Sequence, residues 1–348
     1  MSGAESDADS DVAELENDIE KFNRSVTAFI SSHRADSARL TNLPRRRGVP
    51  RGPRKAAEPK GEVKARLTMA IHAFINDDYS LAKTLVFEVI RINAETYQAW
   101  VTLASIFEEE GDPDRALMST VYAAHLRPND IAGWLKCADI ALKRAGSDSE
   151  GDLRTARLCY SAALRADPRN TVARLGRAGV CRRQGHTHMA LADYKAALGQ
   201  DPLNIEIIRK LAETCMESGT VEPAAIRSYE DFLTRFKLGD NLARSRATWD
   251  DARMYAQLYA GMGQHRRAVE ALRSFSRWLL GRAAETYWDE WTADDREWDS
   301  DDVRRSKVSG FACHPDNRDA YGLGLPLDVR ALLALYRLVL GDVDEAMV

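Results

Sequence analysis

One short phrase of sequence recurs along this chain of 348 residues and constrains its fold more than any other feature. In each copy an alanine comes about five positions after a turn-forming Gly or Asn, and a bulky residue often follows four positions later. The repeated alanines are Ala82, Ala116, Ala156, Ala190, Ala225, Ala268 and Ala346. Their successive separations are 34, 40, 34, 35, 43 and 78 residues, so the period is 34 with insertions in some loops. A period of this length predicts a row of similar helical hairpins.

The second copy, residues 97–130, shows why each unit is expected to be a pair of helices. Trp100, Leu103 and Phe107 recur at helical spacing and form one apolar stripe. A Gly-Asp-Pro turn beginning at Gly111 then interrupts the helix, since Gly accepts the turn and Pro suits the start of the next helix. These features are typical of tetratricopeptide repeats. Weaker copies of the same pattern occupy residues 66–94, 205–237 and 249–281.

The sequence therefore predicts an all-α protein, a tetratricopeptide-repeat α-solenoid in which helical hairpins form a right-handed superhelix. No hairpin can bury both of its faces alone, so stacked neighbours are expected to create the core. The predicted domains are a disordered acidic and then basic tail at 1–60, six repeats at 61–281, an acidic, Trp-rich insertion at 282–326 and a truncated seventh repeat at 327–348. Because the last repeat is only half a hairpin, we expect the chain to be a piece of a longer protein.

The N-terminal tail changes its charge abruptly. Residues 1–20 hold eight acids and no Lys or Arg, whereas residues 34–66 hold eleven Lys or Arg against three acids. The basic cluster consists of Arg45, Arg46, Arg47, Arg51, Arg54 and Lys55. Pro and Gly interrupt it, so it is not expected to form a stable helix. Two interpretations stay open: a nuclear import signal or a contact with nucleic acid or an acidic partner, and a solvated linker.

The insertion combines acids with aromatic residues. Residues 282–302 hold nine acids opposed by Arg282 and Arg296 alone, with Tyr287, Trp288, Trp291 and Trp298 among them. This composition suits a segment that docks on a basic surface, including the groove of the solenoid itself. From there it would lower the affinity of the groove for a partner until it was displaced. The alternative is that the tryptophans cover the edge of a repeat while the acids face water.

No pattern of catalytic or metal-binding residues stands out. The composition is that of an ordinary soluble protein, with 45% hydrophobic residues, 29% charged residues and a net charge of -4. The five cysteines have no metal-ligand spacing, and we expect most of them to be reduced and buried in helical stripes. His186 and His188 lie in a turn, and Cys313 has no second cysteine at ligand spacing. We therefore predict no enzyme activity, cofactor, metal, small-molecule substrate or membrane span.

A solenoid of this kind binds partners through the groove lined by the first helix of each hairpin, which suits an extended or helical polypeptide. The register of the repeats predicts the groove residues Gln98, Val101, Ser105, Glu108, Leu135, Asp139, Leu175, Arg182, Glu206, Arg209, Glu213, Arg253 and Gln257. Co-chaperones with such repeats hold a C-terminal carboxylate with Lys and Asn at fixed positions. Here those positions hold Leu67, Ile71, Val101 and Ser105, which cannot do so.

Three segments carry a closer resemblance. The run 109–117 (Glu-Glu-Gly-Asp-Pro-Asp-Arg-Ala-Leu) is followed by 123–130 (Ala-Ala-His-Leu-Arg-Pro-Asn-Asp) and Trp134. The basic stretch 45–55 precedes residues 70–79. After a variable insertion, residues 325–330 lead into residues 340–346. This order resembles the large repeat subunit of general transcription factor IIIC, best in fungal-type members and over most of residues 55–348.

The resemblance implies a nuclear scaffold of the RNA polymerase III machinery. In that family the N-terminal repeat array recruits factor IIIB subunits during preinitiation complex assembly and contacts other factor IIIC subunits. It meets DNA only indirectly, through the complex, and performs no chemistry. One alternative is another nuclear tetratricopeptide scaffold, associated with RNA processing or chromatin. A further alternative is a targeting arm for a catalytic domain beyond residue 348.

Overall fold

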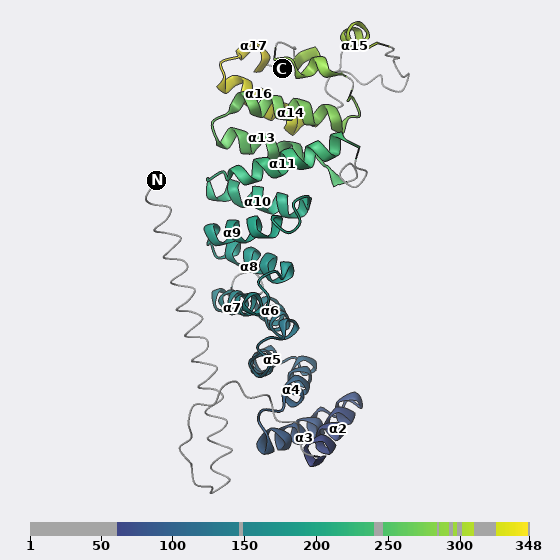
Figure 1. Cartoon of the computed structure of the whole chain (residues 1–348), viewed down its shortest axis with the longest axis vertical. Helices are drawn as coiled ribbons and strands as arrows, with labels where there is room; N and C mark the ends of the chain where they lie inside the picture. Colours follow the sequence, from purple (N-terminus) through teal and green to yellow (C-terminus); the bar gives the residue numbers. More distant parts are fainter. Residues whose placement is uncertain are drawn as a thin grey trace, which may run out of the picture. The chain divides into compact units, whose positions relative to one another are not determined.

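The computed structural model describes residues 61–145, 149–239, 246–283, 285–291, 295–297, 301–309 and 325–346 (Figure 1). The tail 1–60, with its basic cluster, lies outside the described residues, as do Cys313 and Trp298. The chain divides into two compact units, Met1–Ala190 and Leu191–Val348. Every regular element among the described residues is a helix.

The first unit is a stack of helical hairpins. The pairs are α2 (Gly61–Ile75) with α3 (Tyr79–Ile92), α4 (Tyr97–Glu109) with α5 (Pro113–Leu126), and α6 (Ile131–Ala145) with α7 (Glu150–Ala166). They are followed by α8 (Thr171–Arg183) and by the start of α9 (Thr187–Leu198). The second helix of each pair also contacts the first helix of the next pair, so neighbouring hairpins share a core.

The turn that ends α4 shows how local sequence sets the hairpin. Gly111 has φ 71°, a left-handed conformation that glycine adopts without steric cost. Asp112 caps α5, because its side chain accepts a hydrogen bond from the backbone N–H of Arg115, and Pro113 occupies the first turn. In the first hairpin the corresponding position is Asp77, with φ 61°, a left-handed conformation that Asp adopts more readily than most residues other than glycine.

Two tryptophans form equivalent hydrogen bonds in successive hairpins. The indole N–H of Trp100 donates to the carbonyl of Ala94 at 2.8 Å, and that of Trp134 donates to the carbonyl of Pro128 at 3.0 Å. His125 packs edge-on against Trp134, with ring centroids 5.0 Å apart. Burial lowers the pKa of His125, so the neutral ring is favoured in this apolar position.

A close approach between helices depends on Gly176 in α8. An alanine Cβ at this position would lie 2.4 Å from Cζ of Tyr160 in α7, whereas one at Gly179 in the same helix would meet nothing within 4 Å. We expect Gly176→Ala to lower the free energy of unfolding by about 1–2 kcal/mol, because the tyrosine ring must move out of its packed position. Urea denaturation followed by circular dichroism measures the change.

Gly179→Ala is the matched control for this prediction. It should stabilise the protein by roughly 0.5–1 kcal/mol, because alanine is the better helix former and the space is open. Equal stability of the two variants would show that Tyr160 adopts another rotamer at no cost.

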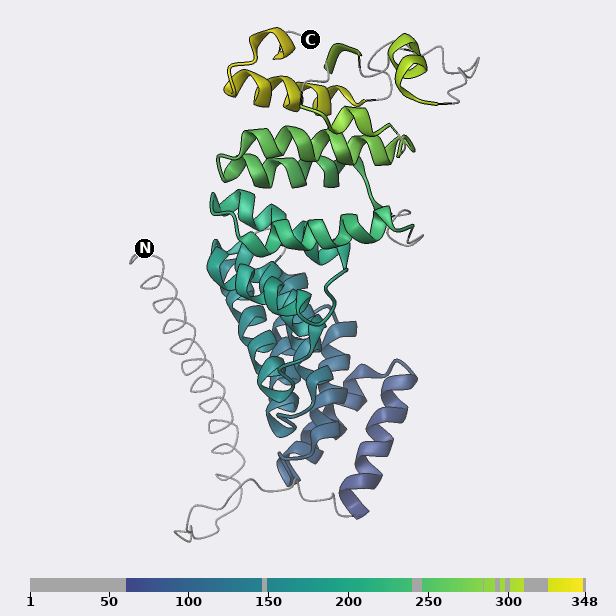
Figure 2. The ribbon, with the colours of Figure 1, turned by 45° about the horizontal axis from the view of Figure 1, so that its top comes forward.

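The second unit continues with the end of α9 and the pairs α10 (Ile205–Ser218) with α11 (Pro223–Lys237) and α13 (Trp249–Gly261) with α14 (His265–Leu279). Short helices η1 (Thr286–Asp289), η2 (Asp295–Glu297) and α15 (Asp301–Lys307) precede α16 (Leu327–Val339) and α17 (Val343–Ala346). The green α13 and α14 lie side by side, and α16 packs on α14 (Figure 2).

The predicted all-α array of tetratricopeptide-like hairpins is confirmed. The four described cysteines, Cys137, Cys159, Cys181 and Cys215, are free and buried, as expected. None of the described helices combines the length and the apolar character that crossing a membrane requires. The domain boundaries proposed from sequence stay predictions.

Candidate partner-binding groove

All thirteen predicted groove residues lie on the first helices of their hairpins, and none of them is buried in the core. In the first unit they occupy α4 (Gln98, Val101, Ser105, Glu108), α6 (Leu135, Asp139) and α8 (Leu175, Arg182). In the second unit they occupy α10 (Glu206, Arg209, Glu213) and α13 (Arg253, Gln257). The register of the repeats therefore selected positions that are at least partly exposed, and their role in partner binding stays a prediction.

In the first unit, α4, α5 and α6 form a small recess of about 180 Å³ whose lining includes Val101. Polar contacts close its rim. The hydroxyl of Tyr97 donates to Asp130 at 3.2 Å, and Lys136 forms an ion pair with Glu108 at 3.0 Å. The predicted residue Glu108 thus already has a partner on the next hairpin, and the recess accepts only a small group.

The second unit holds a larger cleft, with a volume of about 690 Å³, between α10, α13 and α16. Four predicted residues line it: Arg209, Glu213, Arg253 and Gln257. Helix α16 supplies the opposite wall through Asp328, Ala331, Leu332 and Leu335. We call this space the α10–α13–α16 cleft.

Arg209 holds two helices of the cleft together. Its Nε and Nη2 donate to the two carboxylate oxygens of Asp251, each at 2.8 Å, and Nη2 also donates to the backbone carbonyl of Arg246. Asp251 has no solvent exposure and accepts two further bonds from the backbone N–H and the hydroxyl of Thr248. The hydrogen bond to Asp251 raises the pKa of Arg209 and keeps it charged. Arg209 is therefore a structural residue of the cleft wall.

Arg253 differs, because its partners are exposed. It forms ion pairs with Asp250 in its own helix and with Asp328 in α16, whose side chains are 69% and 46% exposed. Such pairs rearrange readily when a ligand approaches. Arg253 is thus the better candidate for partner contact.

The chemistry of the α10–α13–α16 cleft is mixed. Its lining carries two guanidinium groups and four carboxylates, and both guanidinium groups are engaged by carboxylates of the cleft. Met254, Leu332 and Leu335 add apolar surface, and Leu335 is 51% exposed. Apolar side chains beside charged ones suit an amphipathic polypeptide.

Two features of this cleft were not predicted from the sequence. Asp251 follows Thr248 by three residues and forms a capping box with it, and that spacing is visible in the sequence. The wall from α16 repeats the spacing of the groove positions in α10 and α13, at Asp328, Ala331 and Leu335. Extending the register to the seventh repeat finds these residues.

In the described part of the insertion, Asp289 and Asp295 pair with arginines of α14 and α16 and not with the predicted groove residues. Asp295 bridges two buried arginines, at 3.2 Å from Nε of Arg273 in α14 and 3.0 Å from Nε of Arg337 in α16. Asp289 pairs with Arg277 at 2.6 Å. The buried position of these arginines explains the difference, because they need carboxylates nearby.

Aromatic residues of the insertion complete this contact. Trp288 is 1% exposed. The ring centroid of Trp291 lies 4.1 Å from the guanidinium carbon of Arg337 and 4.8 Å from that of Arg266. Burial raises the pKa of Tyr287 to about 12, with Glu285 adding to the effect. We call the described residues 285–291 and 295–297 the acidic strap.

Among the described residues, no cluster of three or more His, Cys, Asp or Glu side chains has a geometry that could hold a metal ion. Cys313 and its neighbouring histidine lie outside those residues.

Comparison with known proteins gives the family context. The chain is 27% identical over 306 residues to transcription factor tau subunit sfc4 of Schizosaccharomyces pombe, covering 83% of this chain and 29% of that protein. It is 25% identical over 212 residues to human general transcription factor 3C polypeptide 3, covering 60% and 22%. It is 23% identical over 336 residues to the transcription factor tau 131 kDa subunit of Saccharomyces cerevisiae, covering 82% and 32%.

The resemblance to the repeat subunit of factor IIIC is confirmed, because the chain is homologous to these subunits over most of its length. It spans about a third or less of the length of these relatives. All three bear the names of transcription factor components, in agreement with the prediction that this chain is not an enzyme.

No protein-family model matches the chain. Among solved structures, a thermophilic tetratricopeptide protein of Thermus thermophilus is 24% identical with a TM-score of 0.31, covering 57% of this chain and 99% of that one. A tetratricopeptide repeat protein of Parabacteroides merdae is 14% identical with a TM-score of 0.38, covering 80% and 99%.

Proposed function

We propose that this chain is a protein-interaction scaffold of the RNA polymerase III initiation machinery, acting in the nucleus as part of factor IIIC. Its groove recruits subunits of factor IIIB, and other surfaces contact factor IIIC subunits. The observation that carries the proposal is the homology to a transcription factor tau subunit over 83% of the chain.

The α10–α13–α16 cleft supports the recruiting role. It is the larger of the two spaces described along the first helices, and it combines half-exposed apolar side chains with exposed carboxylates. Interfaces of this composition gain affinity from a few central apolar anchors and specificity from the charged rim. In the tail, the basic cluster 45–55 would serve nuclear import.

Affinity purification tests the assignment. The tagged chain, expressed in a fungal host, should recover factor IIIB and other factor IIIC subunits from nuclear extract at moderate salt. Recovery of RNA-processing or chromatin proteins in their place would favour the alternative nuclear scaffold and overturn this one.

A substitution in the cleft tests the role of the groove. Leu335→Glu places a charge on the apolar wall, and we expect it to weaken recovery of factor IIIB subunits roughly tenfold or more, which corresponds to about 1.4 kcal/mol. Quantitative pull-down measures the effect. Leu238→Glu is the matched control, since Leu238 is 79% exposed in the same unit and is not part of the cleft lining. Equal recovery with both variants would exclude this cleft as the binding site.

A further inference from the structure

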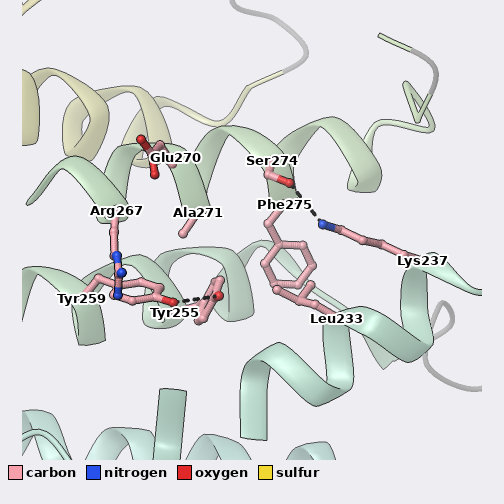
Figure 3. Close-up of a pocket in the computed structure, with 9 residues that line it drawn as sticks. All are labelled: Leu233, Lys237, Tyr255, Tyr259, Arg267, Glu270, Ala271, Ser274 and Phe275. Carbon is pink, nitrogen blue, oxygen red and sulfur yellow. Dashed lines mark hydrogen bonds between the residues drawn. The ribbon is translucent and has the colours of Figure 1, made fainter. Parts of the chain in front are cut away.

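A separate pocket of the second unit lies among α11, α13 and α14, with a volume of about 280 Å³ (Figure 3). Its walls are apolar and aromatic, and its rim is polar. The walls are Leu233, Tyr255, Tyr259, Ala271 and Phe275, and the rim residues are Lys237, Arg267, Glu270 and Ser274. We call it the α11–α14 pocket. It shares no lining residue with the α10–α13–α16 cleft.

The two cations of the rim stand at opposite ends of the pocket, with the aromatic side chains between them (Figure 3). Lys237 Nζ donates a long hydrogen bond of 3.4 Å to the hydroxyl of Ser274. Arg267 donates to the side-chain carbonyl of Gln264 at 3.1 Å. Within the described parts of the chain, neither cation has a carboxylate at ion-pair distance.

Other cations nearby are satisfied. Arg273 and Arg277, on the same helix as Arg267, each pair with a carboxylate of the acidic strap. The one acid of the rim, Glu270, forms an ion pair with Arg266 at 3.2 Å and so is already partly neutralised. Burial lowers the pKa of Lys237, with Arg277 acting in the same direction and Asp289 opposing it. Burial thus disfavours the charged ammonium group of Lys237, and a bound anion would offset this penalty.

We propose that the α11–α14 pocket binds an acidic segment of a protein partner that carries a bulky apolar residue between carboxylates. The apolar side chain would enter among Leu233, Tyr255 and Phe275, where the walls are already desolvated. Carboxylates on either side would pair with Lys237 and Arg267. The complementary charge commits the site to an acidic occupant, since a basic one would meet two unpaired cations.

Peptide binding to the purified full chain tests this directly. The probe is a fluorescein-labelled peptide of twelve residues with a central Phe flanked by Asp and Glu, measured by fluorescence polarisation. We expect binding that weakens roughly tenfold or more when Phe is replaced by Ala, when the acids are replaced by Lys, or when the chain carries Lys237→Glu and Arg267→Glu. Lys237→Arg should retain affinity.

Lys143→Glu is the control for a general charge effect, because Lys143 is an exposed cation of α6 in the first unit and is paired with Asp139. Circular dichroism establishes that each variant is folded, and Lys237→Met with Arg267→Met gives a second, milder version of the loss. Binding unchanged by both double variants would overturn the proposal, and so would binding that ignores the central Phe. Binding that appears only after the acids of residues 1–20 are neutralised would assign the pocket to the chain's own tail and overturn the assignment to a partner.

Discussion

Replacing Arg209 by methionine should lower the free energy of unfolding by about 3–5 kcal/mol, the range seen when one partner of a buried ion pair is removed. Asp251 has no solvent exposure, and Arg209 supplies two of its hydrogen bonds. Methionine retains the apolar character and most of the length of the aliphatic part of the arginine side chain. The loss of stability therefore measures the contribution of the guanidinium group. Urea denaturation followed by circular dichroism measures the change.

Arg253→Met is the control, because it removes the same group from the same cleft. Its partners, Asp250 and Asp328, are exposed, so the expected loss is below about 1 kcal/mol. If the two variants were equally stable, Thr248 and Tyr229, which also donate hydrogen bonds to Asp251, would suffice to satisfy that carboxylate, and Arg209 would return to the set of partner-contact residues. A partner-binding defect in Arg209→Met therefore has to be corrected for stability before it is interpreted.

The repeat period was sufficient to predict most of the fold. The spacing of small alanines and the turns before them predicted the hairpins, because the same close approach recurs wherever a second helix packs on its first helix. The same register placed the groove residues on the first helices. The register did not predict which side chains of the chain pair with one another. Arg209 and Asp251 are 42 residues apart and meet only when neighbouring hairpins stack.

The contacts of the insertion were likewise not predictable from the sequence alone. Its acid and aromatic composition predicted docking on a basic surface, yet the surface itself was not visible in the sequence. Arg273 and Arg337 belong to helices separated by the insertion, and each resembles an ordinary exposed cation in a helical pattern. Only the packed structure shows that they are buried and share Asp295.

Replacing Asp295 by asparagine should lower the stability of the second unit by about 3–5 kcal/mol, because two buried arginines lose the carboxylate between them. Asparagine keeps the size of the side chain, so lost packing contributes little. Urea denaturation followed by tryptophan fluorescence is a suitable measurement, since Trp288 and Trp291 lie in the acidic strap.

Asp302→Asn is the matched control, because that carboxylate is 92% exposed and pairs only with Arg305 of its own helix in the described structure, so little change is expected. The measurement also separates two roles for the acidic strap. A strap that held partners away from the groove would, when weakened, tighten binding and leave stability almost intact. A strap that supplies counter-charges to Arg273, Arg277 and Arg337 would, when weakened, lower stability and leave the affinity of the folded cleft unchanged. The buried geometry predicts the second result, and tighter binding at full stability would contradict it.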